Sequence, residues 1–259
     1  MISTSLSPRG VLTLTLNRPE KHNALDATIL SALHAALLDA ENSEYVRVVV
    51  LTGAGASFCA GADIAHMRSM RDASEEQNVE DARLVAQCLR ALDELDRPLI
   101  ARVNGNVFGG GVGLVACADV AIGVQSAKFA LTEVRLGLVP ATISPYVIAA
   151  IGARQARRLF LAALPFDANE ALSLGLLHAV ASPERLDETV DRYVDALLRA
   201  GPAALRAAKK LVRMVGATND REVLQEETSR LLAKLRVSAE GKEGLSAFLE
   251  RRSANWVAK

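Results

Sequence analysis

Residues 99–124 read LIARVNGNVFGGGVGLVACADVAIGV, and this stretch decides the fold class. Residues 99–103 and 120–124 are short apolar runs, which is typical of strands that are buried on both faces. Between them, the glycines at positions 109–111 lead into a run of small apolar residues that predicts a helix. A strand, a helix and a second buried strand in this order indicate parallel strands joined by crossovers. The sequence therefore predicts an α/β fold.

Strands and helices also alternate on both sides of this stretch. The expected elements are a strand over 10–17, a helix from Asp26 to about Asn42, a strand over 46–51, a loop over 53–57, a short helix opened by residues 61–63, a helix over 75–95 and a strand-like segment over 128–131. From Ser144 onward the apolar spacing is helical almost throughout, with Pro202 at a helix start. We expect this helical region to pack on the core or on a sister subunit.

Composition excludes several classes of protein. The chain has 259 residues, of which 50% are hydrophobic and 23% charged, with a formal net charge of zero. Half the chain is apolar, which excludes global disorder, and the absent net charge gives no field that would attract nucleic acid or an anionic membrane. Three scattered cysteines indicate no disulfide framework. We expect a soluble, cytoplasmic protein without a secretory leader, and we assign the apolar residues 107–124 to the core because Asp119 interrupts them.

Two segments of small residues offer backbone amides as binding groups. Residues 59–64 (CAGADI) and 109–113 (GGGVG) are both expected to enter helices. The first amides of a helix lack intrahelical partners and lie at the positive end of its dipole. Two such helix starts that meet at one point would form an oxyanion hole. A packing requirement for small residues explains either segment equally well.

Glu133 is the candidate for acid–base chemistry. It follows the apolar run 129–131 and precedes several further apolar residues. Apolar surroundings disfavour the charged form of a carboxyl group and so suit it for proton transfer near neutral pH. The alternative is a structural role, as a helix cap or in an ion pair with Arg135 or Lys128.

Other patterns are weaker. The four histidines show no spacing typical of metal ligands, so no metal site is expected, and nothing in the sequence activates Cys59 toward His66. Residues 111–116 fit the dinucleotide-binding pattern G-x-G-x-x-A. We expect residues 104–108 to separate these glycines from the preceding strand, which disfavours an NAD-binding oxidoreductase.

Four segments in order resemble the enoyl-CoA hydratase/isomerase (crotonase) superfamily. They are residues 17–25 (NRPEKHNAL), 60–64 (AGADI), 109–111 (GGG) and 129–134 (FALTEV). The resemblance implies a spiral of ββα units over residues 1–199 and a helical region over 200–259 that builds homotrimers, often paired into hexamers. It also implies acyl-CoA thioester substrates, with coenzyme A as part of the substrate and no separate cofactor.

The resemblance also implies roles for particular residues. The amides of Ala62 and Gly110 would hold the thioester oxygen, and Glu133 would be the acid–base group. The residues implied to contact coenzyme A are Lys21, His22, Ala60, Asp63 and Ile64. Relatives often carry a lysine at the position of Ala65, so part of the phosphate contact is expected to be missing or supplied elsewhere.

Gly113 departs from the family pattern. Hydratases with two catalytic glutamates carry the first glutamate at this position. Three hypotheses follow: Glu133 alone carries out a hydration, Glu133 shuttles a proton in a 3-enoyl to 2-enoyl isomerisation, or the chain only binds acyl-CoA.

The segment after Glu133 favours hydration. Residues 140–145 (PATISP), with Gly-Val-Gly upstream, look like the methylglutaconyl-CoA and carboxygeranoyl-CoA hydratases, whose substrates are branched and bear a distal carboxylate. Arg68, Arg71 and Arg135 are candidate partners for such a carboxylate. The sequence therefore predicts hydration of a branched 2-enoyl-CoA such as 3-methylglutaconyl-CoA.

Overall fold

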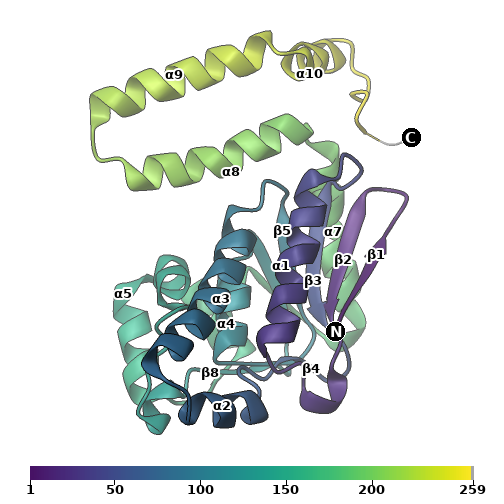
Figure 1. The fold of residues 1–259 in the computed structure, drawn as a ribbon. Coiled ribbons are helices and arrows are strands. Elements are labelled where there is room, and N and C mark those ends of the chain that lie inside the picture. The colour runs from purple at the N-terminus through teal and green to yellow at the C-terminus, as the bar shows by residue number, and fades with distance from the viewer. Residues whose placement is uncertain (258–259) are drawn as a thin grey trace.

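Two sheets and their covering helices make up the core of the computed structural model, which describes residues 1–257 (Figure 1). The larger sheet has six strands in the order β1-β2-β3-β5-β7-β10. Their bounds are Ile2–Leu6 (β1), Val11–Leu16 (β2), Val48–Gly53 (β3), Leu99–Val103 (β5), Val120–Val124 (β7) and Ala179–Ala181 (β10). Every neighbouring pair is parallel except β1 with β2. The predicted α/β class with parallel strands is therefore confirmed.

A smaller sheet carries four short strands in the order β4-β6-β8-β9. Their bounds are Ser57–Cys59 (β4), Asn106–Phe108 (β6), Lys128–Ala130 (β8) and Phe166–Asp167 (β9). The pairs β4 with β6 and β6 with β8 are parallel, whereas β9 is antiparallel to β8. Three neighbouring carboxyl ends therefore lie at one edge of this sheet.

Helices cover the larger sheet and separate the two sheets. The core helices are α1 (Ala27–Asn42), α2 (Ile64–Arg71), α3 (Glu75–Glu94), α4 (Gly110–Ala116), α5 (Ser144–Ala162), α6 (Ala168–Leu174) and α7 (Leu186–Arg199), with 3₁₀ helices η1 (Pro19–Lys21), η2 (Glu133–Leu136) and η3 (Pro183–Arg185). Helix α1 packs against α3 and against β1 and β2, and α7 packs against β3, β5, β7 and β10. No helix in the described part of the chain combines the length and apolarity needed to span a membrane.

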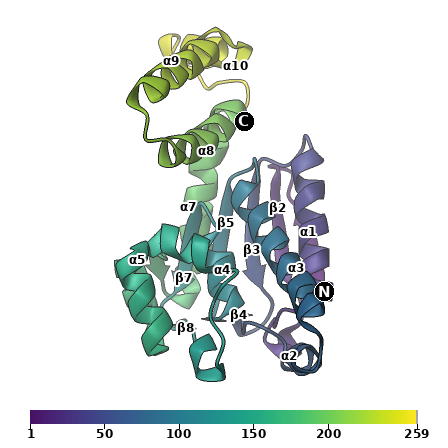
Figure 2. The same cartoon turned by 60° about the vertical axis from the view of Figure 1, so that its left-hand side comes forward.

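The last three helices lie beyond one end of the core, to which the first of them is bound by ion pairs such as that of Lys209 with Asp119 (Figures 1 and 2). They are α8 (Pro202–Ala217), α9 (Arg221–Val237) and α10 (Ala239–Leu249). Helix α10 is fastened to the start of α8 because the Glu240 carboxylate accepts hydrogen bonds of 2.9 and 2.8 Å from the amides of Ala203 and Ala204. A carboxylate at a helix N-terminus satisfies amides that lack intrahelical partners.

Local signals placed the long helices correctly. Asp26 caps α1 by accepting a hydrogen bond of 2.9 Å from the Ile29 amide. Ser74 and Gln77 form a reciprocal capping box at the start of α3. Pro202 is the first residue of α8, where its missing N–H costs no hydrogen bond.

Three expectations about the connecting segments were wrong. The expected loop over 53–57 overlaps the end of β3 and the start of β4. The short helix begins at Ile64, because Asp63 is its N-cap and residues 61–62 precede the cap. Residues 104–108 were expected to separate the glycines of the dinucleotide-binding pattern from the preceding strand. In the structure, β6 ends at Phe108, directly before Gly109.

Buried Asn23 ties the loop after β2 to the loop before β4. Its side-chain oxygen accepts a hydrogen bond of 2.9 Å from the Arg18 amide, and its side-chain nitrogen donates to the carbonyls of Ala54 (2.9 Å) and Ser57 (2.8 Å). The residue is fully buried and has a φ of +56°, a conformation in which asparagine is enriched. One side chain therefore satisfies three backbone groups that frame the entrance to β4.

Asn23→Ala is expected to lower the free energy of unfolding by about 3 kcal/mol, because it leaves one amide and two carbonyls without their partner. Denaturant unfolding followed by circular dichroism measures the change. Asn219→Ala, at an exposed asparagine, is the control and should stay within about 0.5 kcal/mol of the unmodified protein. Equal midpoints for the Asn23 and Asn219 variants would contradict the role of Asn23.

Candidate active site

The predicted site residues follow three neighbouring strands of the smaller sheet. Residues 60–63 come after β4, residues 109–110 after β6 and residues 131–133 after β8. Since these strands are parallel, their carboxyl ends open at the same edge, which is where ligands bind in open α/β sheets. Segments about 50 and 70 residues apart in sequence are therefore neighbours in space.

The three segments come into direct contact through two glycines. A Cβ atom on Gly61 would lie 3.6 Å from the Cα of Gly109, and a Cβ atom on Gly109 would lie 3.3 Å from Oε1 of Glu133. Gly61 and Gly109 have φ angles of +85° and +49°, which side chains disfavour. The structure thus brings together the two glycine-containing loops and the predicted acid–base group.

The first candidate donor is the amide of Ala62. Residue Leu25 forms a parallel bridge with Ala62, since its amide donates to the Gly61 carbonyl (2.7 Å) and its carbonyl accepts from the Asp63 amide (2.8 Å). These two bonds flank Ala62, so its own N–H faces away from Leu25. Within residues 1–257, no protein acceptor takes this N–H. The donor belongs to an extended segment and not, as expected, to a helix start.

The second candidate donor is the amide of Gly110, the first residue of α4. Gly109 is the N-cap, and its amide donates to the Ala130 carbonyl at 2.9 Å, which fastens the start of α4 to the end of β8. The Gly110 amide has no intrahelical partner, and none of the described residues accepts from it. A Cβ atom here would lie 3.1 Å from Cδ1 of Leu25. Leu25, to which the sequence analysis gave no role, therefore contacts both candidate donor segments.

Glu133 begins η2 and lies half-buried beside these loops. Its Oε2 atom is buried without a hydrogen-bond partner, and among the described residues neither Lys128 nor Arg135 forms an ion pair with it. Burial raises the pKa of the Glu133 carboxyl above its usual value, in the direction that its apolar neighbours in sequence predict. A buried acceptor without a partner is available to a ligand.

Gly113 lies one turn further along α4, and no side chain fits there. A Cβ atom at this position would overlap the Cγ2 of Ile143 and would lie 2.8 Å from the Cβ of Ile143 and 3.3 Å from Cδ2 of Leu89. Ile143 and Leu89 are 2% and 1% exposed. Apolar packing therefore fills the place at which two-glutamate relatives carry their first glutamate.

A cavity of about 440 Å³ opens beside Ala62. Its lining contains every residue that the resemblance assigned to coenzyme A, namely Lys21, His22, Ala60, Asp63 and Ile64. The candidate donor Ala62 also lines it, as do Ala24, Ala65 and Arg68. Arg68 lies one turn after Ala65 on α2, so it brings a cation to the helix face where relatives often carry a lysine.

Asp63 is engaged within the protein. Its carboxylate accepts hydrogen bonds from Arg18 (2.9 Å) and Lys21 (3.0 Å), and it caps α2 through the amides of Ala65 (2.8 Å) and His66 (3.2 Å). The bond from Lys21 and those from the two amides lower the pKa of Asp63 to about 2.

The charges of this network cancel, because Arg18 also binds Asp26 at 2.6 Å. Two cations, Arg18 and Lys21, face two carboxylates, Asp26 and Asp63. Arg68 has no ion-pair partner in the described part of the chain, so it supplies the unbalanced positive charge of the cavity.

The weaker patterns do not converge on this site as reactive groups. Burial raises the pKa of the Cys59 thiol to about 12, so the thiol stays protonated, and the His66 ring lies 2.8 Å from the Asp81 carboxylate. No cluster of three or more His, Cys, Asp or Glu side chains within residues 1–257 could hold a metal ion.

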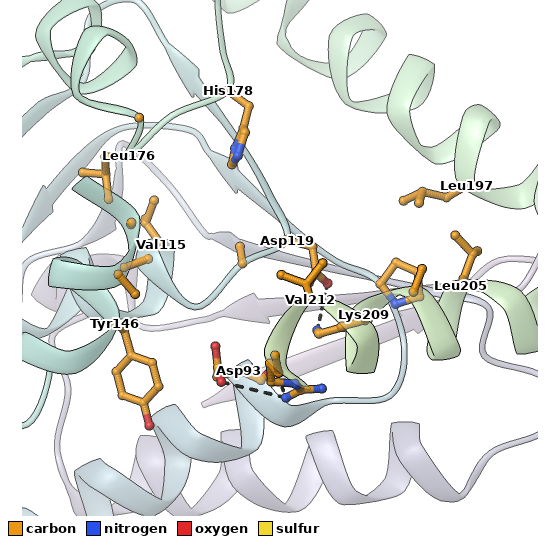
Figure 3. Close-up of a pocket in the computed structure, with 18 residues that line it drawn as sticks. Asp93, Val115, Asp119, Tyr146, Leu176, His178, Leu197, Leu205, Lys209 and Val212 are labelled. Carbon is orange, nitrogen blue, oxygen red and sulfur yellow. Dashed lines mark hydrogen bonds and ion pairs between the residues drawn. The ribbon is translucent and has the colours of Figure 1, made fainter. Parts of the chain in front are cut away.

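A larger cavity, of about 630 Å³, lies elsewhere (Figure 3). It includes Val115 at the carboxyl end of α4 and is bounded by α8, whose Lys209 binds the Asp119 carboxylate at 2.8 Å. The same Asp119 oxygen accepts from the Leu99 amide at 2.7 Å, so Asp119 joins the start of β5 to α8. None of the predicted site residues lines this cavity.

Comparisons with known proteins agree with this architecture. A family model described as enoyl-CoA hydratase/isomerase matches residues 7–259. The crystal structure of an enoyl-CoA hydratase from Shewanella pealeana has a TM-score of 0.95 and 39% identity, covering 98% of this chain and 95% of that one. The crotonyl-CoA hydratase of Syntrophomonas wolfei is 32% identical over 95% of this chain and 94% of its own length. The 1,2-epoxyphenylacetyl-CoA isomerase of Escherichia coli strain K12 is 31% identical over 97% of this chain and 96% of its own.

These similarities extend over nearly the whole chain, and the likeness to solved structures confirms the predicted crotonase-like fold with its C-terminal helices. The chain therefore belongs to the enoyl-CoA hydratase/isomerase family.

Proposed function

We propose that the chain hydrates a 2-enoyl-CoA thioester, with the amides of Ala62 and Gly110 on the thioester oxygen and Glu133 as the only acid–base side chain. The contact among Gly61, Gly109 and Glu133 carries this proposal. Two segments whose amides have no acceptor among the described residues touch here, and Glu133 lies against one of them through Oε1 while its buried Oε2 has no partner in residues 1–257. Each oxyanion donor is worth roughly 3 kcal/mol in transition-state stabilisation.

In the proposed reaction, Glu133 takes a proton from water as the water oxygen forms a bond to C3. The electrons of the C2–C3 double bond move toward the thioester oxygen, and the two amides stabilise the resulting enolate. Glu133 then delivers the proton to C2, the carbonyl re-forms, and the carboxylate returns to its starting state. The raised pKa of Glu133 supports this role, because a group that both takes and returns a proton works best when its pKa lies nearer to the working pH.

We propose a branched substrate with a distal carboxylate, such as 3-methylglutaconyl-CoA, on the basis of the segment 140–145. The three candidate arginines differ in their surroundings. Arg71 pairs with Asp72 at 2.8 Å, and Arg68 lines the cavity assigned to coenzyme A. Arg135 is exposed, has no ion-pair partner in residues 1–257 and shares η2 with Glu133. Arg135 is therefore the proposed partner of the distal carboxylate.

Isomerisation is the second candidate, and the packing at Gly113 favours it. Moving a proton between C4 and C2 requires a single base and no bound water. The site has one such carboxyl, and Ile143 closes the space beside Gly113. Two of the relatives are named as isomerases. In either reaction coenzyme A is part of the substrate, and we propose no further cofactor.

Glu133→Gln is expected to reduce turnover of enoyl-CoA esters at least about 1,000-fold while leaving the dissociation constant of the ester nearly unchanged, because the amide keeps the shape but cannot accept the proton. Loss of the enoyl-thioester absorbance measures hydration of crotonyl-CoA and 3-methylglutaconyl-CoA. Conversion of a 3-enoyl to a 2-enoyl ester without hydration would assign the enzyme to isomerisation.

The pH profile of the unmodified enzyme tests the same role of Glu133 independently. As the base, Glu133 must be ionised, so kcat/KM should rise with pH through a raised pKa, above the ordinary 4.5. Full turnover by Glu133→Gln, or a profile without this acidic limb, would exclude the carboxyl as the base. Tight ester binding by the unmodified protein without any turnover would show that the chain only binds acyl-CoA.

Arg68→Ala is expected to weaken binding of acyl-CoA about tenfold, because it removes the unbalanced cation of the cavity. Titration calorimetry with a non-reactive acyl-CoA, at two salt concentrations, measures the loss. Arg71→Ala, on the same helix but paired with Asp72, is the control and should bind normally. Equal affinities of the two variants for the acyl-CoA would show that the phosphates of coenzyme A do not bind at Arg68.

We propose that the helices from residue 200 onward associate with sister subunits as a trimer or a pair of trimers. They lie beyond one end of the core (Figure 2), and their surface carries large exposed apolar side chains: Val212, Val237, Leu245, Phe248 and Leu249, which are 73%, 68%, 54%, 81% and 78% exposed. Monomeric proteins rarely expose such surfaces.

Light scattering is expected to give the mass of three or six chains of 27.6 kDa, and Phe248→Asp is expected to shift the protein to smaller species. The substitution places a charge on an apolar interface. Tyr45→Asp is the control and should not change the mass. Tyr45 lies between α1 and β3, outside the last three helices, and is 80% exposed. A single-chain mass at micromolar concentration would refute the assembly.

A further inference from the structure

The segment that carries Glu133 has little attachment to the rest of the protein. Between residues 132 and 143, only Pro140 and Ile143 are buried. The apolar residues between them and η2 point outward, with Leu138 56% and Val139 67% exposed. Pro140 and Ile143 are therefore the fully buried side chains that hold this segment on the core beyond its start at Leu131.

Hydrogen bonds do not supply the missing attachment. The Leu138 amide donates to the Glu133 carbonyl at 3.1 Å, and the Ala141 amide donates to the Val139 carbonyl at 2.7 Å. In the part of the chain that the structure describes, every backbone hydrogen bond of residues 132–143 stays within this segment or reaches the first turn of α5. Such bonds shape the segment but do not fix it to other elements.

Ile143 makes the contact that fixes it. A Cβ atom on Gly113 would lie 2.8 Å from the Cβ of Ile143, whereas carbon atoms in contact are normally about 3.5–4.0 Å apart. The Ile143 side chain therefore rests on the bare backbone of α4. Cδ2 of Leu89, on α3, lies 3.3 Å from the same Cβ position.

This contact lies close to the proposed oxyanion donor. Gly113 follows Gly110 by three residues, which is about one helical turn of 5.4 Å. Ile143 belongs to the segment that begins with Glu133, while Gly113 belongs to the helix that begins with Gly110. This apolar contact thus joins the two elements at the far end of the segment, whereas the hydrogen bond from the Gly109 amide to the Ala130 carbonyl joins them just before it begins.

We infer that Ile143 is a positioning residue, which by packing on Gly113 sets the Glu133 carboxylate relative to the Gly110 amide. The kinetic consequences rest on the proposed function, whereas the attachment of the segment does not. An error of about 1 Å in the placement of a catalytic group costs roughly 100-fold in rate. Binding of coenzyme A is independent of this contact, because its proposed cavity is lined by η1, α2 and adjoining loops.

Ile143→Ala is expected to lower kcat roughly 100-fold and to change KM for the acyl-CoA ester less than about threefold. Hydrogen exchange, which needs no turnover, should show faster exchange of the amides of residues 133–143. Ile143→Val removes one methyl group, so it should fold and give smaller changes in the same direction. Unchanged kcat and unchanged exchange in both variants would overturn the inference.

Compensation at Gly113 provides the sharper test. Gly113→Ala alone adds a methyl group where Ile143 lies, so kcat should fall. In Gly113→Ala/Ile143→Ala the Cγ2 atom that the added methyl would overlap is gone, although the Cβ atom of residue 143 remains close. The double variant should therefore lose less activity than the product of the two single losses. Losses that simply multiply would show that the two positions act separately and would refute the pairing.

Ile151→Ala separates positioning from general loss of stability. Ile151 lies on α5, two turns beyond Ile143, and is 7% exposed. The variant should unfold more easily but keep the kcat of the folded enzyme and the exchange rates of residues 133–143. A kcat loss equal to that of Ile143→Ala would overturn the inference. If the unmodified enzyme turned over no ester, the proposed function would fail, and the exchange comparison would still decide whether Ile143 anchors the segment.

Discussion

Close approach of two backbone segments, at Gly61 and Gly109, is the constraint on which the rest of the site depends. Each glycine has a positive φ, and a side chain on Gly61 would lie 3.0 Å from the carbonyl oxygen of Phe108. The loops can meet only because both lack a Cβ atom. Parallel pairing of β4, β6 and β8 brings them to one edge, and the glycines allow the final approach. The distance between the two unpaired amides is thus set by backbone geometry, which is more rigid than any pair of side-chain donors.

The long helices could be predicted from sequence because their signals are local. The caps of α1 and α3 depend on a side chain and an amide three residues away, and such short-range bonds leave a readable pattern. The strands β4, β6 and β9 contain three, three and two residues. So few residues show no periodicity, and their extended form depends on neighbours that the sequence does not name. The connections around the site were therefore the part predicted least well.

The same distinction applies to individual site residues. The burial of Glu133 could be anticipated because its neighbours along the chain are apolar. The contacts of Leu25 with both candidate donors, and of Ile143 with Gly113, join residues 30 or more positions apart. No spacing rule reports such contacts. Glycine at position 113 indicates only a missing carboxylate, whereas the structure shows that Ile143 occupies the space.

The cations of the candidate site lie in the cavity beside Ala62 and are kept apart from Glu133. A cation beside Glu133 would stabilise the carboxylate and lower its pKa, which would make it a weaker base. Lys128 and Arg135 are both near in sequence, yet neither pairs with it among the described residues. The cations of the proposed coenzyme A cavity lie on η1 and α2, where Asp63 binds Lys21 and Arg68 has no ion-pair partner among the described residues. In the proposed function, an anionic carrier is thus attracted at one end, while at the other the proposed proton-transferring carboxyl of Glu133 has no cationic partner within residues 1–257. The space at Gly113 is likewise filled by apolar side chains, those of Ile143 and Leu89, and not by a charged group.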